Sequence, residues 1–221
     1  MNFAAVLFDL DGTLLDTLSD IANAMNPFLL SIGLEPAPAE AYRTRVGSGL
    51  RQLVERSLPP EYQTAELIER GMRQWSIEYE RAPADATVPY PGVDRVLAAL
   101  GEHGIPCSIV TNKPDALAQV VVQSLLGRYR FESVQGDIPG LPRKPDPAVS
   151  LKMARAMGVA PEQTLFLGDS DVDMQTAIAA GMFPAGAAWG FRGAEELKLA
   201  GAREVLAQPL DLLDLMGLNG R

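Results

Sequence analysis

The chain has 221 residues, of which 47% are apolar, and a formal net charge of −9 at pH 7. This apolar content is enough for a sizeable core and excludes a disordered chain. The negative charge, without any run of five lysines or arginines, argues against nucleic acid or an anionic membrane as the main partner.

The compartment follows from the cysteine content and from the start of the chain. Cys107 is the single cysteine, so no internal disulfide forms and a cytoplasmic protein is favoured. The apolar run over residues 3–8 lacks a basic segment before it and is too short for a signal sequence. No stretch reaches the apolar length that spans a bilayer. We therefore expect a cytoplasmic protein.

The first predicted strand covers residues 4–10 and ends in acids. The stretch "VLFDLDGT" runs from apolar residues into Asp9 and Asp11, followed by Gly12 and Thr13. Charged residues at the end of an otherwise buried strand cost free energy unless something binds them. This end of the strand is therefore a candidate site.

A helical block follows the first strand. Residues 18–85 show helical patterns and no convincing strand. The block is bracketed by Asp16 and Thr17 before it and by "VPYPGV" after it. We expect a second small domain of residues 17–87, inserted into a core of residues 1–16 and 88–221.

Strands and helices alternate in the rest of the chain. Strands are predicted over residues 106–111, 131–135 and 164–168, and more weakly over 185–189 and 204–206. Helices are predicted over residues 93–103, 115–126, 148–157 and 172–180. This alternation is typical of an α/β protein with a Rossmann-like parallel sheet, here with a helical cap domain inserted after the first strand.

Polar residues follow several of these strands, and ligands of open parallel sheets bind beyond the carboxyl ends of the strands. This edge should collect the acids of the first strand, Thr111 and Asn112 of the second, Lys144 of "RKPDP", and the acids of "GDSDVD". Converging carboxylates repel one another, and a hard cation such as Mg²⁺ removes that cost. A threonine and a lysine beside such a cation indicate an anionic oxygen ligand. The edge is therefore predicted to be a phosphate site.

The same four stretches carry a family resemblance. "DLDGT", "VTN", "RKPDP" and "GDSDVD" resemble, in order and spacing, the four motifs of the haloacid dehalogenase superfamily. "PYPGV", "WGFR" and "LAQPLDLLDLM" are similar to its phosphoglycolate phosphatase-like branch. The resemblance covers essentially the whole chain and implies a hydrolase of phosphoric monoesters.

The resemblance also implies roles for individual residues. Asp9 is expected to be the nucleophile that forms an aspartyl-phosphate, and Asp11 the general acid and base. Mg²⁺ is expected as the cofactor, held by Asp9, the main-chain carbonyl of Asp11, and Asp169, with Asp173 nearby through water or hydrogen bonds. Binding of the phosphoryl oxygens is assigned to Thr111, Asn112 and Lys144, with Gly12 allowing close approach of the backbone.

A glycine-rich loop in the predicted cap suggests where the rest of the substrate binds. In "RVGSGLRQL", Ser48 and Gly49 precede a predicted helix, whose free amides favour an anion. Arg51 and Arg45 lie close by and are expected to contact a carboxylate. The alternative is a glycine-rich turn with two solvated arginines.

Several functions stay open from the sequence. The substrate is expected to be a small phosphorylated metabolite, with phosphoglycolate as the first candidate and pyrophosphate and nucleoside monophosphates as the next. A sugar phosphomutase is another possible activity.

A dehalogenase is disfavoured because such enzymes lack an acid at the position of Asp11. A phosphonoacetaldehyde hydrolase is disfavoured because residues 17–87 contain no lysine. A phospho-accepting switch module belongs to another class and is less favoured, since it needs neither a cap nor a second acid. The chain is expected to be a monomer or homodimer.

Overall fold

A six-stranded parallel sheet forms the centre of the computed structural model, which describes residues 3–218. The strand order is β5-β4-β1-β6-β7-β8. Its strands are β1 (Ala5–Phe8), β4 (Cys107–Pro114), β5 (Val134–Asp137), β6 (Thr164–Gly168), β7 (Phe183–Ala187) and β8 (Glu204–Leu206). The α/β fold class expected from the sequence is confirmed.

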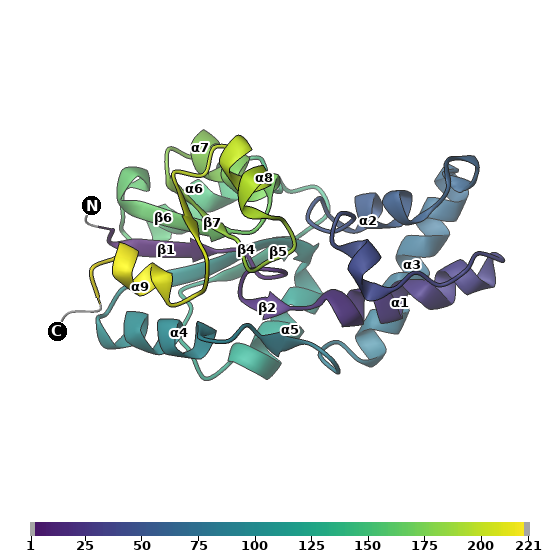
Figure 1. Cartoon of the computed structure of the whole chain (residues 1–221), viewed down its shortest axis with the longest axis horizontal. Coiled ribbons are helices and arrows are strands. Elements are labelled where there is room, and N and C mark those ends of the chain that lie inside the picture. Colours follow the sequence, from purple (N-terminus) through teal and green to yellow (C-terminus); the bar gives the residue numbers. More distant parts are fainter. Residues whose placement is uncertain (1–2, 219–221) are drawn as a thin grey trace.

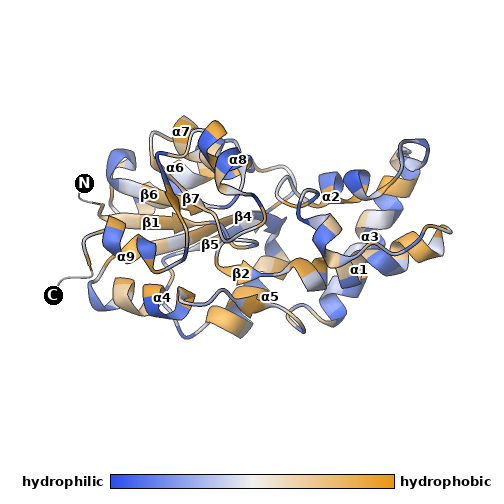
Figure 2. Ribbon diagram, viewed as in Figure 1, coloured by the Kyte–Doolittle hydropathy of each residue, from blue (hydrophilic) through white to orange (hydrophobic). Residues whose placement is uncertain are grey.

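Helices cover both faces of this sheet (Figure 1). One face carries α4 (Val93–Glu102), α5 (Asp115–Leu126) and α9 (Asp211–Leu215), and the other carries α6 (Ala148–Ala156), α7 (Asp171–Ala179) and α8 (Ala194–Leu199). The central strand β1 is buried on both sides, with Val6 and Phe8 packed in one apolar cluster and Leu7 in the other. Its continuous apolar sequence fits this position (Figure 2).

The cap is built from the helices between the two short strands β2 (Leu15–Asp16) and β3 (Val88–Pro89). They are α1 (Leu18–Ser31), α2 (Leu50–Ser57) and α3 (Ala65–Arg81), with 3₁₀ turns at Ala39–Tyr42 and Pro60–Tyr62. β2 and β3 pair antiparallel, so the chain enters and leaves the cap side by side. In Figure 1 the cap projects from one end of the sheet.

Close packing holds the cap helices together. A Cβ added at Gly71 of α3 would lie 2.7 Å from the Phe28 ring of α1, so glycine allows the two helices to approach. The indole of Trp75 donates a hydrogen bond to the Ile21 carbonyl at 3.2 Å. The apolar core continues from the sheet into these helices. We propose that residues 17–87 form the cap domain and the rest the core; residues 1–2 and 219–221 of those bounds lie outside the described part.

The sequence-based boundaries agree with the structure within a few residues, with two kinds of difference. Strand β4 continues past residue 111 to Pro114, with an irregular register against β5 after Val110. The short elements β2, β3, α8 and α9 were not predicted, because two to six residues carry too little periodicity to be recognised. A 3₁₀ turn at Pro161–Gln163 leads into β6. Within residues 3–218, none of the helices combines the length and apolarity needed to traverse a bilayer.

Candidate active site

The predicted site residues meet where three adjacent strands end. β1 pairs with β4 on one side and with β6 on the other, in parallel. Their carboxyl ends therefore bring Asp9, Thr111 and Asp169 to one edge of the sheet, the edge that faces the cap. All three side chains are buried.

Lys144 joins two carboxylates at this edge. Its ammonium lies 2.7 Å from Asp9 Oδ1 and 2.6 Å from Asp173 Oδ1. Burial alone would lower the pKa of Lys144, but Asp173 and Asp9 raise it above its ordinary value. Burial and the charge of Asp173 raise the pKa of Asp9 to about 7, against the opposing effect of Lys144. The lysine offsets part of the negative charge, and the remaining excess favours a cation.

Asp173 is fixed from the start of α7. Its Oδ2 accepts hydrogen bonds from the Ser170 amide at 3.0 Å and from the Ser170 hydroxyl at 2.6 Å. Gly168 lies directly against it, since an added Cβ there would come within 2.3 Å of Asp173. These contacts leave Asp173 Oδ1 directed at Lys144.

Asp169 is held by the loop after β1 and the loop after β7. Its Oδ1 accepts from the Thr13 hydroxyl at 3.3 Å, and its Oδ2 accepts from the Phe191 amide at 2.7 Å. Gly12 has a φ of +87°, and a Cβ there would lie 2.3 Å from Asp169 Oδ2. Glycine is therefore required at position 12 both by its backbone conformation and by the neighbouring carboxylate.

The arrangement of acids fits a hard divalent cation. Asp9, Asp169 and Asp173 each offer a carboxylate oxygen, and these atoms lie within 4.8 Å of one another. Burial, followed by the charges of Asp173 and Asp9, raises the pKa of Asp169 well above its ordinary value. An oxygen-only donor set suits Mg²⁺, which would also relieve the mutual repulsion. Asp173 lies within this group, and its carboxylate already accepts hydrogen bonds from Lys144 and Ser170.

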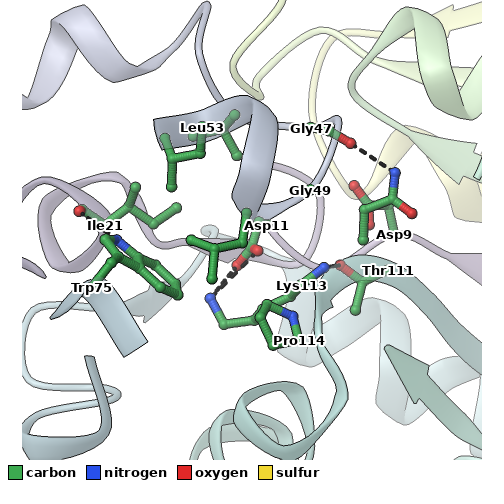
Figure 3. Close-up of a pocket in the computed structure, with 13 residues that line it drawn as sticks. Asp9, Asp11, Ile21, Gly47, Gly49, Leu53, Trp75, Thr111, Lys113 and Pro114 are labelled. Atoms are coloured by element: carbon green, nitrogen blue, oxygen red, sulfur yellow. Dashed lines mark hydrogen bonds and ion pairs between the residues drawn. The ribbon is translucent and has the colours of Figure 1, made fainter. Parts of the chain in front are cut away.

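A pocket lies between this edge and the cap (Figure 3). It encloses about 40 Å³ and is lined from the core by Asp9, Asp11, Thr111, Asn112, Lys113 and Pro114, and from the cap by Ile21, Val46, Gly47, Gly49, Leu50, Leu53 and Trp75. The small volume and the apolar side chains of the cap suit a small ligand.

Hydrogen bonds join the cap to the core around this pocket. Asn112 donates its side-chain amide to the Gly47 carbonyl and to the Lys144 carbonyl, each at 3.0 Å. Arg192 of the core donates to the carbonyls of Thr44 and Val46 at 3.1 and 3.3 Å. In return, Arg43 of the cap donates to the Gly190 carbonyl at 3.3 Å. The cap therefore lies closed over the site.

The expected cap residues divide into two groups. Gly49 lines the pocket, whereas Ser48 accepts a hydrogen bond from Arg56 at 3.2 Å and Arg51 pairs with Glu69 at 2.8 Å and with Glu55 at 3.6 Å. Helix α2 turns Leu50 and Leu53 toward the pocket, and Arg51 therefore lies on another side of the helix. The structure does not bring Arg51 to the site.

Lys113 is a pocket residue that the sequence interpretation missed. Its ammonium lies 3.2 and 3.4 Å from the two Asp11 oxygens and 4.1 Å from the centre of the Tyr79 ring. Burial alone would lower the pKa of Lys113, but Asp11 raises it above the ordinary value. The available signal was its position directly after Thr111 and Asn112, at the end of a predicted strand.

The fold and the strand-end motifs define a class of hydrolase, and comparison with known proteins identifies it. Residues 6–187 match the family model of the haloacid dehalogenase-like hydrolases. The chain belongs to this family, and it is a phosphatase of the phosphoglycolate phosphatase-like type.

Individual relatives are similar over most of the chain. A phosphoglycolate phosphatase of Pseudomonas putida is 38% identical over 84% of this chain and 70% of its own length. One from Chromobacterium violaceum is 34% identical over 97% of both chains. The crystal structure of a predicted phosphoglycolate phosphatase from Haemophilus somnus is 26% identical, covers 97% of this chain and 98% of its own, and superposes with a TM-score of 0.88.

Proposed function

We propose that this phosphatase hydrolyses a small phosphate monoester, with phosphoglycolate as the first candidate, through an aspartyl-phosphate on Asp9 and with Mg²⁺ as cofactor. The observation that carries the proposal is the contact of Asp9 with Lys144 at 2.7 Å, within a buried group of three carboxylates. The names of the curated relatives support the substrate. The family assignment removes the switch module from consideration.

The first half of the reaction forms the intermediate. An Asp9 carboxylate oxygen attacks phosphorus, and the bond between phosphorus and the ester oxygen breaks. Asp11 gives its proton to the departing oxygen, which leaves as an alcohol. Lys144, the Thr111 hydroxyl and the Asn112 main-chain amide hold the phosphoryl oxygens, where negative charge must be stabilised.

The second half returns the enzyme to its starting state. Asp11, now ionised, takes a proton from a water molecule that attacks the phosphorus of the aspartyl-phosphate. The bond between phosphorus and the Asp9 oxygen breaks, inorganic phosphate is released, and the Asp9 carboxylate is restored. Asp9 and Asp169 would hold Mg²⁺ together with the Asp11 carbonyl, and Asp173 lies close enough to assist. The bound ion would offset the charge of the carboxylates and of the phosphoryl group.

The test combines a substrate panel with one isosteric substitution. The wild-type enzyme should hydrolyse small phosphate esters in Mg²⁺, with the highest kcat/KM for phosphoglycolate, and should lose activity in excess chelator. Asp9→Asn should lower kcat by more than about 10³-fold while the circular dichroism spectrum stays unchanged. A variant with nearly wild-type turnover, and no deamidation in its mass spectrum, would remove Asp9 as the nucleophile.

A further inference from the structure

Lys113 carries a positive charge in a part of the pocket that the proposed phosphoryl site does not use. Its side chain is 2% exposed, and its ammonium touches Asp11 of the core and the Tyr79 ring of the cap. Among the described residues that line the pocket, it is the one basic side chain. Lys144 does not line the pocket, and its ammonium pairs with the carboxylates of Asp9 and Asp173.

The neighbouring Asp11 indicates which end of the substrate would meet Lys113. In-line displacement places the attacking and leaving oxygens on opposite sides of phosphorus. The group that protonates the leaving oxygen must lie within hydrogen-bond reach of it. If Asp11 has that role, the leaving group occupies the part of the pocket next to Asp11, which Lys113 borders. Figure 3 shows Asp11 and Lys113 pointing toward one another, with Ile21 and Trp75 on the side away from Asp9.

We propose that Lys113 binds an anionic leaving group and thereby makes the enzyme selective for phosphate esters that carry a carboxylate close to the ester oxygen. This inference rests on the proposed function and adds the residue that determines specificity. The short separation between Asp11 and Lys113 suits a carboxylate near the ester oxygen, as in phosphoglycolate.

The surroundings of the leaving group make such a cation necessary. Ile21, Leu53 and Trp75 form apolar walls, so a carboxylate there would lose most of its water. A carboxylate buried without a charged partner is destabilised, because it loses its hydration and gains no compensating interaction. Arg51 does not line the pocket, and its guanidinium pairs with Glu69 and Glu55 on the surface of the cap.

Tyr79 keeps the lysine in place when the leaving group is absent. The ammonium lies over the ring face at 4.1 Å, a favourable cation–π geometry. Tyr79 belongs to α3, so the closed cap positions Lys113 from one side while Asp11 holds it from the other. The cation is therefore preorganised before substrate arrives, which lowers the cost of ordering it.

The test compares phosphoglycolate with ethyl phosphate, which has a similar size and no carboxylate. In the wild type, phosphoglycolate should have the higher kcat/KM. Lys113→Met should lower kcat/KM for phosphoglycolate about 100-fold, as expected for a lost charge-assisted contact. The decrease for ethyl phosphate should be at least ten times smaller, about 10-fold at most. Lys113→Arg should retain part of the preference, and Lys198→Met, which removes an exposed lysine of α8, should change neither substrate.

Equal losses on both substrates would overturn the inference and leave Lys113 as a partner of Asp11 alone. No loss on either substrate would also overturn it. A third substrate, phosphoethanolamine, tests the wild type without any substitution, so the inference stays testable if Lys113→Met does not fold. The cationic ester should be the poorest of the three, and a wild type that prefers it would contradict the proposal.

These outcomes separate the inference from the proposed function. A wild type that hydrolyses ethyl phosphate in Mg²⁺ and shows no preference for phosphoglycolate would overturn the role of Lys113 while the phosphatase mechanism stands. Loss of the mechanism itself would be seen in Asp9→Asn, which tests the nucleophile with either substrate.

Discussion

Asn112 of the core donates its side-chain amide to the Gly47 carbonyl of the cap at 3.0 Å. The same amide group also donates to the Lys144 carbonyl, so one side chain joins the cap loop, the end of β4 and the loop that carries the lysine. Closure of the cap and placement of Lys144 are therefore linked through a buried residue whose neighbour, Thr111, lies at the proposed phosphoryl site.

Loss of the Lys144 charge should impair both turnover and stability. Lys144→Ala leaves Asp9 and Asp173 without their cation, and we expect kcat/KM to fall by about 10²–10³-fold, as for loss of one transition-state donor. Breaking a buried ion pair should also lower the free energy of unfolding by about 3 kcal/mol. Steady-state kinetics and urea denaturation measure the two effects. Lys152→Ala on α6 is the control, and a Lys144→Ala enzyme within twofold of wild type would contradict the assignment.

The stabilisation by Mg²⁺ should increase with pH. The pKa of Asp9 is raised from its ordinary value of 3.8 to about 7, so between these values the folded metal-free protein keeps a proton that the unfolded chain releases. The free energy of unfolding therefore falls as the pH rises through this window. Bound Mg²⁺ favours the ionised carboxylates and removes the loss. Saturating Mg²⁺ should raise Tm more at about pH 8 than at about pH 5.5.

Asp169→Asn provides the matched control for this experiment. It removes one charge from the cluster but keeps an oxygen and nearly the same volume, so its Tm should respond much less to Mg²⁺. Equal Mg²⁺ shifts at both pH values in the wild type would argue that the acid cluster is not where the ion binds.

The bonds that close the cap should affect all substrates alike. Arg192→Ala removes two hydrogen bonds to the cap carbonyls of Thr44 and Val46. We expect kcat/KM to fall about 30-fold on phosphoglycolate and on ethyl phosphate, because two bonds of about 1 kcal/mol each are lost and closure precedes chemistry. Arg128→Ala, which removes an exposed ion pair with Asp94, should leave both values unchanged. Wild-type kinetics in Arg192→Ala would show that these bonds do not limit closure.

The connection between the cap and the core should depend on Asp20. Its buried carboxylate accepts from the Ala86 and Thr87 amides at 3.0 and 2.9 Å and from the Thr87 hydroxyl at 2.5 Å. Asp20→Asn replaces one acceptor oxygen by a donor that faces other donors. We expect the free energy of unfolding to fall by about 2 kcal/mol or more, measured by urea denaturation. Asp94→Asn, at an exposed position of α4, is the control, and equal stabilities of the two variants would refute a special role for Asp20.

The sequence could predict those site residues whose position follows from strand order. Asp9 and Asp169 end two apolar strands, and parallel strands bring their carboxyl ends together whatever the loops do. Lys113 was missed because its role depends on the continuation of β4 beyond Thr111 and on contact with Tyr79, 34 residues earlier in the chain. The direction of Arg51 likewise depends on the rotation of α2 about its axis and on Glu69 of another helix. Neither the role of Lys113 nor the direction of Arg51 follows from the sequence pattern around it.

The position of Arg51 is where the sequence-based prediction and the structure differ most clearly. The glycine-rich loop before α2 suggested that Arg51 binds the substrate carboxylate, whereas the structure pairs it with Glu69 and Glu55 on a surface where its side chain is 41% exposed. Such exposed pairs contribute about 0.2–1 kcal/mol each. We expect Arg51→Ala to lower the free energy of unfolding by no more than about 1 kcal/mol. Its KM for phosphoglycolate should stay within about twofold of the wild-type value, as for an ordinary surface substitution. Lys113→Met measured in parallel is the positive control. The contradicting outcome would be a large rise in KM of Arg51→Ala for phosphoglycolate without a rise for ethyl phosphate. It would mean that Arg51 leaves Glu69 and Glu55 and turns into the pocket when substrate binds, so that the cap provides the carboxylate site.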